Sequence, residues 1–365
     1  MKVLLTGANG FIGKNIQVWL KNNNHTCLSY DKDNTEEQLI EYIKEADFII
    51  HLAGINRPLT KEEFYDGNSN FTKKLVDLVK EYNSNLPIIF SSSIQAELDN
   101  DYGKSKKLAE NYLFESNLNV FVYRLCNVYG KWCSPNYNSV VATFCNNIAN
   151  ELDITINNRE TVLRLNYIDD ICKEFLDVIE NKVVRDNKQV LYVEPIDECS
   201  LGSLADLLYS YKESRNNKFV PSMNNDFERK LYATYLSYLP TDKFSYPLDS
   251  HIDNRGSFTE MLKTMNNGQV SVNISHPGIT KGNHYHNTKN EKFLVVSGKC
   301  SIKFRKIGTD EVIEYIVSGD KLEVVDIPTG YTHNITNIGD SDSVTIMWAN
   351  ELFDPDNPDT YYEIV

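Results

Sequence analysis

The chain has 365 residues, more than one ordinary hydrophobic core accommodates, and this length favours two domains. Hydrophobic residues make up 41% and charged residues 24%, as in soluble globular proteins, and no apolar run reaches the roughly 18 residues that would span a bilayer. A formal net charge of -14 argues against nucleic acid or anionic membrane as partners, so an acidic substrate would need a local basic pocket.

The cysteines and the first residues predict a cytoplasmic location. Seven cysteines are scattered without a C-x-x-C pair, which argues against a disulfide framework or a cysteine zinc site and favours a reducing compartment. The opening run VLL is too short for the apolar region of a signal peptide, and a glycine turn follows it at once.

Strands alternate with helices through the first two thirds of the chain. The expected strands are 2–6, 26–31, 46–54, 86–93 and 120–125, and the expected helices are 11–22, 102–115 and 227–239. This alternation predicts an α/β fold, a doubly wound parallel sheet of the Rossmann type with helices on both faces.

The pattern changes from about Ser257. Short segments with alternating hydrophobicity, among them QVSVNIS and EKFLVVSG, are separated by Gly, Asn and Asp, which is typical of an all-β sandwich or barrel. We place the boundary in FSYPLDSH, which gives domains of residues 1–246 and 247–365.

A glycine turn follows the first strand. Gly7, Gly10 and Gly13 form G-x-x-G-x-x-G between a strand and a helix, where backbone N–H groups can approach a pyrophosphate. Asp31 closes the second strand, and a carboxylate at that place usually binds the ribose 2′-hydroxyl of a dinucleotide.

A tyrosine and a lysine follow in Y-G-K-S-K. Tyr102 and Lys106 are four residues apart, so on a helix they share one face. A nearby ammonium stabilises phenolate and would lower the tyrosine pKa, so that the tyrosine can exchange a proton with a carbonyl oxygen. The preceding SSS run offers a hydroxyl to the same oxygen. The alternative is an ordinary surface pair on a helix.

These residues resemble the extended short-chain dehydrogenase/reductase family over about the first 240 positions. TGANGFIG, HLAG, SSSIQA, YGKSK, RLCNVYG and NYIDDI occur in the family's order, and members commonly act on nucleotide-linked sugars. The resemblance implies Ser93, Tyr102 and Lys106 as the catalytic triad, with Ser92 as the alternative serine. It implies cofactor contacts from Gly7, Asn9, Gly10, Phe11, Ile12, Gly13, Asp31, Leu52, Ala53, Gly54 and Lys106.

The basic pocket has four candidate residues, Arg57, Arg124, Lys131 and Arg164. The predicted substrate-binding residues are Arg57, Arg124, Asn127 and Lys131. Arg124 is the preferred candidate because it ends an apolar strand beside the active-site segment, although each of the basic residues alone is more often a surface charge.

The last third of the chain carries a set of metal-ligand side chains. His284 and His286 are two apart, so on a strand both point to one face, and Glu291 begins an apolar strand that could return alongside. His333 follows a Pro-x-Gly turn. Three imidazoles and one carboxylate suit zinc, manganese, iron or nickel. The alternative is two exposed histidines near a turn and an unrelated third.

The spacing of these ligands resembles the two motifs of the cupin family. The segment from Gly278 to Gly298 matches the first motif, and PTGYTHNITN matches the second, with the glycine that usually precedes the proline displaced to Gly319. The resemblance implies a jelly-roll barrel over roughly residues 250 to 365, with His284, His286, Glu291 and His333 as metal ligands.

The combined chain resembles bifunctional capsular polysaccharide enzymes from end to end, including GKWCSPNYNS and NISHPGITKGNH. The resemblance implies a cupin that epimerises carbon 3 of a UDP-2-acetamido-2,6-dideoxy-4-ketohexose. The reductase domain then reduces carbon 4 with NADPH, which gives UDP-N-acetyl-6-deoxy-L-talosamine. Zinc and a homodimer are implied as well.

Three questions stay open at this point. Asp31 favours NADH, whereas the family implies NADPH, whose 2′-phosphate Lys32 could meet. The first alternative function is a reductase or epimerase of a UDP-sugar with a structural, dimerising cupin. The second is an iron-dependent cupin oxygenase fused to a reductase.

Overall fold

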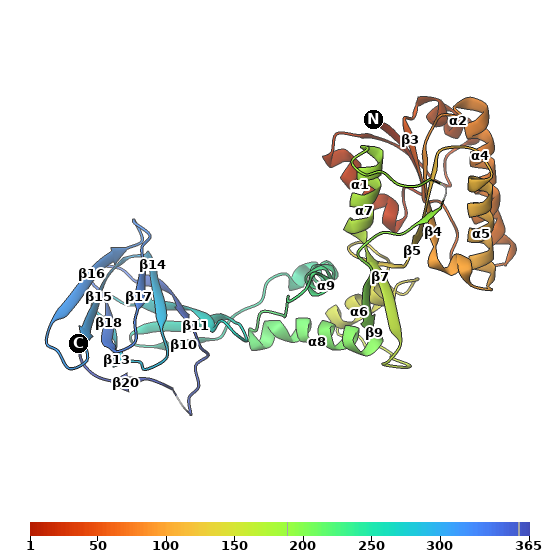
Figure 1. The fold of residues 1–365 in the computed structure, drawn as a ribbon. Helices are drawn as coiled ribbons and strands as arrows, with labels where there is room; N and C mark the ends of the chain where they lie inside the picture. The colour runs from red at the N-terminus through yellow and green to blue at the C-terminus, as the bar shows by residue number, and fades with distance from the viewer. Residues whose placement is uncertain (188, 357) are drawn as a thin grey trace. The chain divides into compact units, whose positions relative to one another are not determined.

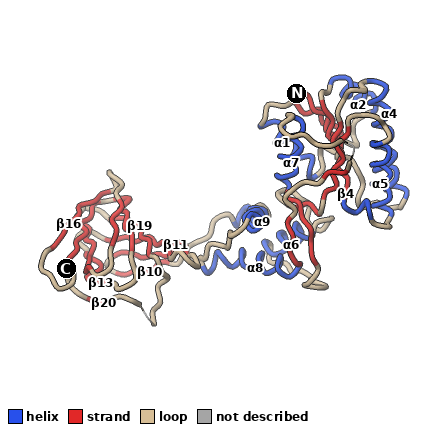
Figure 2. The backbone as a smooth tube through the Cα atoms, viewed as in Figure 1, coloured by secondary structure: helices blue, strands red, loops and turns tan. Residues whose placement is uncertain are grey.

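The structure, a computed structural model, describes residues 1–187, 189–356 and 358–365. Its contacts divide the chain into two units, one formed by residues 1–209 and 223–240 and the other by residues 210–222 and 241–365. Helices flank the strands of the first unit, whereas strands dominate the second (Figure 2).

A parallel sheet of six strands lies at the centre of the first unit, in the order β2-β1-β3-β4-β5-β8. Every residue of the short strand β3 is buried, because helices cover both faces of the sheet. This arrangement confirms the predicted doubly wound fold. The third predicted strand ends at His51, so residues 52–54 form a loop at the edge of the sheet. The strands are β1 (Lys2–Thr6), β2 (Thr26–Tyr30), β3 (Phe48–His51), β4 (Ile88–Ser93), β5 (Val120–Leu125) and β8 (Val190–Leu191).

Two groups of helices cover the two faces of this sheet (Figure 1). On one face α1 and α7 bury Ile16 and Phe175 against Leu5. On the other face α2, α4 and α5 bury Leu39 and Leu75 against the sheet. The helices are α1 (Phe11–Asn22), α2 (Glu36–Glu45), α4 (Phe71–Tyr82), α5 (Asp101–Phe114) and α7 (Ile168–Ile179).

Smaller elements complete this part of the chain. A three-stranded sheet in the order β6-β7-β9 begins directly after β5 and carries residues 127–129 to the same edge of the main sheet. The further elements are α3 (Glu62–Phe64), the π-helix η1 (Tyr65–Asn70), the 3₁₀-helix η2 (Ile94–Glu97), β6 (Asn127–Tyr129), α6 (Val140–Ala149), β7 (Val162–Tyr167), β9 (Asp197–Ser200), α8 (Leu201–Asn217) and α9 (Asp226–Leu236).

The second unit consists of two antiparallel sheets, which confirms the predicted all-β domain. Their inner faces bury a core that includes Phe293, Ile302 and Ile335. The first sheet has the order β10-β11-β12-β19-β14-β17 and the second the order β16-β15-β18-β13-β20. The elements are η3 (Thr241–Lys243), β10 (Ser250–Asp253), β11 (Gly256–Lys263), β12 (Gln269–Ser275), β13 (Thr280–Tyr285), β14 (Glu291–Ser297), β15 (Lys299–Lys306), β16 (Val312–Ser318), β17 (Val324–Ile327), β18 (Tyr331–Asn337), β19 (Ser343–Ala349) and β20 (Tyr361–Tyr362).

None of the described helices is both long enough and apolar enough to cross a bilayer. All seven cysteines are free thiols.

Candidate active site and metal centre

A cavity of about 630 Å³ opens at the carboxyl ends of β1, β3, β4 and β5. Strand β2 lies on one side of β1 and β3 lies on the other, so the direction in which strands are added reverses at β1. Doubly wound proteins bind ligands outside the strand ends at such a switch point. The predicted site residues that line this cavity are Gly7, Asn9, Gly10, Phe11, Ile12, Gly13, Leu52, Gly54, Ser93, its alternative Ser92, Tyr102, Lys106 and Asn127.

Two glycines of the turn after β1, Gly7 and Gly13, have no room for a side chain. Gly7 has a φ of +72°, and a Cβ atom on it would lie 2.8 Å from the backbone nitrogen of Ala53. A Cβ atom on Gly13 would lie 2.3 Å from the carbonyl oxygen of Gly7. Helix α1 begins directly after the turn, so its unpaired N–H groups and positive dipole end lie at the cavity wall. This surface fits a diphosphate. Ala53 lies behind Gly7, and its N–H group donates to Thr6.

Asp31 lies beside the glycine turn, immediately after β2. Its Oδ2 atom accepts from the backbone N–H of Asn9 at 2.8 Å, and its Oδ1 atom accepts from that of Lys32 at 2.8 Å. The carboxylate therefore braces the turn. The side chain of Lys32 is exposed next to it.

The three predicted catalytic residues meet at the end of β4. Asn100 caps α5 by accepting from the N–H of Gly103 at 2.7 Å, which places Tyr102 and Lys106 in the first turns of that helix. Ser93 ends β4 and makes a side-chain hydrogen bond with Tyr102.

The expected lowering of the tyrosine pKa is wrong for this structure. Burial raises the pKa of Tyr102, and the hydrogen bond with Ser93 opposes that rise. Lys106 is itself buried, and its Nζ atom donates to the carbonyl oxygen of Ser91 at 3.0 Å. Burial lowers the pKa of Lys106 to about 8, against the attraction of Glu110. The phenol of Tyr102 is consequently held in its protonated form.

His51 lies beneath this site, and the sequence analysis assigned it no role. Thr72 donates its hydroxyl proton to the carbonyl oxygen of Asn68 at 2.6 Å, so it accepts from Nε2 of His51 at 2.9 Å. Thr6 then donates to Nδ1 of His51 at 2.7 Å. Burial, with the charge of Lys106 nearby, lowers the pKa of His51 to about 3. The neutral ring joins β1, β3 and α4; the HLAG segment contains it, but no spacing signal revealed this role.

The segment GKWCSPNYNS forms a further wall of the cavity, to which the sequence had assigned no role. Tyr137 donates to Oδ1 of Asn56 at 2.7 Å, and the guanidinium of Arg57 lies 5.2 Å from the Tyr137 ring centroid. This loop therefore meets the loop after β3. The lining residues from the segment are Trp132, Cys133, Ser134, Tyr137, Asn138 and Ser139.

The predicted substrate-binding residues separate into two groups. Asn127 lines the cavity, and Arg57 lines a neighbouring open depression with Tyr137. Arg124 lies outside the cavity: its buried guanidinium donates twice to Glu110, at 2.8 and 2.7 Å, and also to Glu97.

Lys131 lies outside the cavity as well, because its ammonium binds both carboxylate oxygens of Asp169 at 2.6 and 2.7 Å. The positions of Arg124 and Lys131 have one physical reason. A half-buried or buried cation needs a carboxylate partner, and for Arg124 and Lys131 that partner comes from a different element of the fold.

Glu110 links the buried arginine to the active-site strand. Ser92 donates to Oε1 of Glu110 at 2.6 Å, so the alternative catalytic serine has a protein partner away from Tyr102. Burial would raise the pKa of Glu110, but hydrogen bonds from Arg124 and Ser92 outweigh it and lower this pKa.

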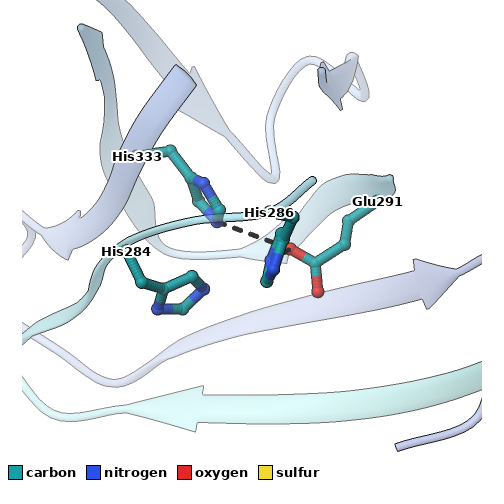
Figure 3. Close-up of side chains that lie close together, drawn as sticks. All are labelled: His284, His286, Glu291 and His333. Atoms are coloured by element: carbon teal, nitrogen blue, oxygen red, sulfur yellow. Dashed lines mark ion pairs between the residues drawn. The ribbon is translucent and has the colours of Figure 1, made fainter. Parts of the chain in front are cut away.

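Four metal-ligand side chains converge in the second unit (Figure 3). His284 lies on β13, His286 follows that strand, Glu291 begins β14 and His333 lies on β18. One ligand atom from each residue lies within 4.8 Å of the other three. A bulge between Gly282 and His284 sets His284 opposite His333.

The strand that begins at Glu291 does not return beside the histidine strand, so that expectation is wrong. Strand β14 pairs with β17 and β19 in the first sheet, whereas β13 and β18 belong to the second. The carboxylate therefore approaches the three imidazoles from the opposite wall of the barrel.

The protonation states in this cluster suit metal binding. Burial and the two other imidazoles lower the pKa of His284 to about 4. Burial would raise the pKa of Glu291, but the imidazoles of His286 and His333, whose Nε2 atoms each lie 3.4 Å from its Oε2 atom, lower it to about 2. The neutral imidazole of His284 and the ionised carboxylate of Glu291 are the forms that bind a cation.

The hydrogen bonding of the cluster also fits a metal ion. Two of the buried atoms that face each other in it, Nε2 of His286 and Oε2 of Glu291, have no hydrogen-bond partner among the described residues. Buried polar atoms rarely lack a partner. Three nitrogen ligands and one oxygen ligand suit a divalent transition metal such as zinc.

Known proteins share both units. Residues 3–193 match the NAD dependent epimerase/dehydratase family, and residues 251–361 match the polysaccharide biosynthesis C-terminal domain. A UDP-2-acetamido-2,6-beta-L-arabino-hexul-4-ose reductase from Pseudomonas aeruginosa is 46% identical over 366 residues, covering 99% of this chain and 98% of that protein. The spore coat polysaccharide biosynthesis protein SpsL from Bacillus subtilis is 27% identical over 122 residues, covering 31% of this chain and 81% of that protein.

Solved structures extend the comparison. The crystal structure of the capsular polysaccharide assembling protein CapF from Staphylococcus aureus matches with a TM-score of 0.94 and 52% identity, covering 100% of both chains. A UDP-glucose 4-epimerase from Thermus thermophilus, in complex with NAD, covers 65% of this chain and 99% of that chain with a TM-score of 0.53 and 16% identity, which shows a shared fold alone. The chain therefore belongs to the NAD dependent epimerase/dehydratase family and is a CapF-like protein, with a polysaccharide biosynthesis C-terminal domain after its dinucleotide-binding domain.

Proposed function

We propose that this protein makes UDP-N-acetyl-6-deoxy-L-talosamine for capsular polysaccharide synthesis in two steps. The barrel epimerises carbon 3 of a UDP-2-acetamido-2,6-dideoxy-4-ketohexose, and the cavity of the first unit reduces the 4-ketone with NADPH. The observation that carries the proposal is that one chain holds both a Ser-Tyr-Lys cavity and a separate metal-ligand cluster. A relative aligned along nearly the whole chain is named as a reductase of a UDP-linked hexul-4-ose.

Tyr102 is the proton donor for the reduction. Its raised pKa keeps the phenol protonated, which is the form that donates a proton to the oxygen on carbon 4. Ser93 shares a hydrogen bond with Tyr102 and can hold the same oxygen. The nicotinamide, bound against the glycine turn, supplies the hydride. We assign it as NADPH, because Lys32 is exposed beside Asp31 and can pair with a 2′-phosphate.

Epimerisation depends on the same ketone. A carbonyl at carbon 4 acidifies the hydrogen on carbon 3, so removal of that proton and its return on the other face invert the centre. His284, His286, Glu291 and His333 would hold one zinc ion, which would supply Lewis acidity to an oxygen of the sugar. Reduction then removes the ketone, so that carbon 3 can no longer invert.

The test is an NMR experiment in heavy water with the 4-keto UDP-sugar and the zinc-loaded protein. Without a nicotinamide, we expect deuterium to enter at carbon 3. With NADPH, we expect the reduced sugar to form with deuterium at the same carbon. A ketone that gains no deuterium would contradict the epimerase role and leave the barrel a structural module. Stoichiometric iron with oxygen uptake would instead favour an oxygenase.

Tyr102→Phe separates the two steps. We expect reduction to fall by roughly 10²- to 10⁴-fold while deuterium exchange continues, because the lost proton donor lies in the cavity and not in the barrel. Tyr112→Phe is the matched control, since Tyr112 lies on the same helix beside Lys73 and outside the cavity lining. Loss of both activities in Tyr102→Phe would contradict separate sites.

A further inference from the structure

The segment of residues 358–365 lies against the strand that carries His284. Strand β20 pairs with β13, with Tyr362 opposite His284 and Tyr361 opposite Tyr285. The rings of Tyr361 and Tyr285 are stacked with their centroids 5.3 Å apart. The segment is therefore part of the sheet that presents two of the four ligands.

Asp359 fills the loop between the ligands His286 and Glu291. Its carboxylate accepts from three consecutive backbone N–H groups: that of Asn287 at 3.1 Å, that of Thr288 at 2.8 Å and that of Lys289 at 2.9 Å. It also accepts from the hydroxyl of Thr288 at 3.0 Å. Successive N–H groups that converge on one carboxylate fix the course of the backbone between them.

The main chain of Asp359 contacts a ligand directly. Its carbonyl oxygen lies 2.6 Å from Nδ1 of His286. A carbonyl can only accept, so Nδ1 carries the proton and Nε2 is left with its lone pair. That Nε2 atom lies 3.4 Å from Oε2 of Glu291, inside the cluster.

The backbone conformation of Asp359 lets its carboxylate bind the loop while its carbonyl oxygen accepts from His286. Its φ is +31°, in the left-handed region that aspartate and asparagine tolerate better than most side chains. Lys289 in the loop also binds the residues on both sides of Asp359. Its buried ammonium donates to the carbonyl oxygen of Pro358 at 3.3 Å and to the hydroxyl of Thr360 at 3.1 Å.

We propose that Asp359 is a positioning residue of the metal centre. Its side chain fixes the loop that separates His286 from Glu291, and its carbonyl sets the tautomer and the orientation of the His286 ring. Ligating histidines commonly donate their second N–H group to such a partner, and the partner orients the ring. The inference rests on the proposed metal site, because it concerns how that site is held.

The test measures zinc affinity of the full chain by competition with a chromogenic chelator. We expect Asp359→Ala to bind zinc about 10- to 100-fold more weakly than the wild type. Asp359→Asn should fall between them, because asparagine keeps one acceptor oxygen and tolerates the same backbone conformation. Asp356→Ala is the matched control: it removes an exposed carboxylate from the same region and should leave the affinity unchanged.

Two further measurements separate positioning from general stability. The visible spectrum of the cobalt-substituted protein reports ligand geometry, and we expect it to change in Asp359→Ala but not in Asp356→Ala. Thermal unfolding of the metal-free protein should differ little between the two variants.

Zinc affinity and a cobalt spectrum in Asp359→Ala equal to those of the wild type would overturn the inference. So would a lower metal-free unfolding midpoint without any change in affinity. A wild-type protein that fails to bind zinc would instead overturn the proposed metal site itself.

Discussion

The two sites of this protein differ in whether their buried polar side chains have hydrogen-bond partners. In the cavity of the first unit, Lys106 donates to Ser91, and Asp31 accepts from the glycine turn. In the barrel, Nε2 of His286 and Oε2 of Glu291 have no hydrogen-bond partner among the described residues. Cavity residues are thus hydrogen-bonded to other parts of the protein, whereas the barrel cluster has buried polar atoms without a partner among the described residues. We expect substitutions in the cavity to change stability, and substitutions in the cluster to change metal binding alone.

The largest expected effect is a loss of zinc affinity on substitution of a metal ligand in the barrel. His333→Leu should weaken zinc binding by at least about 100-fold, because a direct ligand contributes more than the outer partners whose loss costs roughly 10- to 100-fold. The stability of the metal-free protein should not fall, because an unpartnered buried nitrogen beside Phe293 and Phe304 is replaced by an apolar group. Chelator competition and metal-free thermal unfolding check both expectations.

His276→Leu is the control for that substitution, since the side chain of His276 is 45% exposed and pairs with Asp342 at 2.8 Å. Unchanged zinc binding in His333→Leu would remove His333 from the ligand set. A large loss of metal-free stability would break the contrast between the two sites.

Arg124, which lies outside the cavity on strand β5, tests the paired polar side chains of the first unit. Arg124→Met leaves the Glu110 carboxylate buried without its main partner, which should cost about 3–5 kcal/mol of unfolding free energy. The double variant Arg124→Met/Glu110→Leu should recover most of that loss. Urea unfolding of the three proteins measures both effects.

Substrate kinetics sharpen the same comparison. Arg57→Met should raise the KM for the UDP-sugar, because Arg57 lies in the depression next to the cavity, whereas the double variant at Arg124 should not raise it. A raised KM with full stability in Arg124→Met would return Arg124 to the substrate site.

The charge of Lys106 has a smaller, pH-dependent effect on the free energy of unfolding. Its pKa falls from 10.5 to about 8 on folding, so the folded protein disfavours the ammonium by up to about 3 kcal/mol. Below pH 8 the lysine is charged in both states and the full cost is present. Between pH 8 and 10.5 the unfolded chain binds more protons, so stability rises with pH and the cost disappears.

Lys106→Met should therefore stabilise the nicotinamide-free protein at pH 7, and the gain should vanish above about pH 10. Lys104→Met, at an exposed position of the same helix, should change little at either pH. Unfolding measured at pH 7 and at pH 10 decides the matter. A gain of the same size at both values would show that packing, and not the buried charge, is responsible.

The smallest expected effect concerns the choice of nicotinamide. Asp31→Asn keeps an oxygen that can accept from the N–H of Asn9 but removes the charge that repels a 2′-phosphate. The ratio of kcat/KM for NADPH to that for NADH should rise about tenfold, worth roughly 1.4 kcal/mol. Asp33→Asn, two residues away and exposed, serves as the control. An equal fall with both nicotinamides would show that Asp31 only braces the turn.

Local patterns in the sequence predicted much of the fold and of both sites. The glycine turn places Gly7 and Gly13 at the cavity because a strand must end and a helix must begin within a few residues. Tyr102 and Lys106 share a helix face because they are one turn apart. His284, His286 and Glu291 lie within eight positions, and His333 reaches them across a strand pair. In each case the information is contained in spacing along the chain.

The residues that sequence reasoning missed or misplaced depend on contacts distant in the chain. Arg124 has the same type and strand position as a substrate-binding residue, and only the packing of α5 against β5 shows that Glu110 neutralises it. Asp359 lies about seventy positions beyond the loop that it holds. The pKa of Tyr102 depends on how deeply the phenol is buried, which the spacing to Lys106 does not reveal.

The crowding at Gly13 limits how this protein can be redesigned. A methyl group there would lie 2.3 Å from the carbonyl oxygen of Gly7, so no substituted amino acid fits without moving the backbone. An engineer who wishes to convert the enzyme from one nicotinamide to the other must therefore leave Gly13 unchanged. The adaptable positions lie at the end of β2, where Asp31, Lys32 and Asn34 carry side chains, and a small library confined to them samples the useful variation.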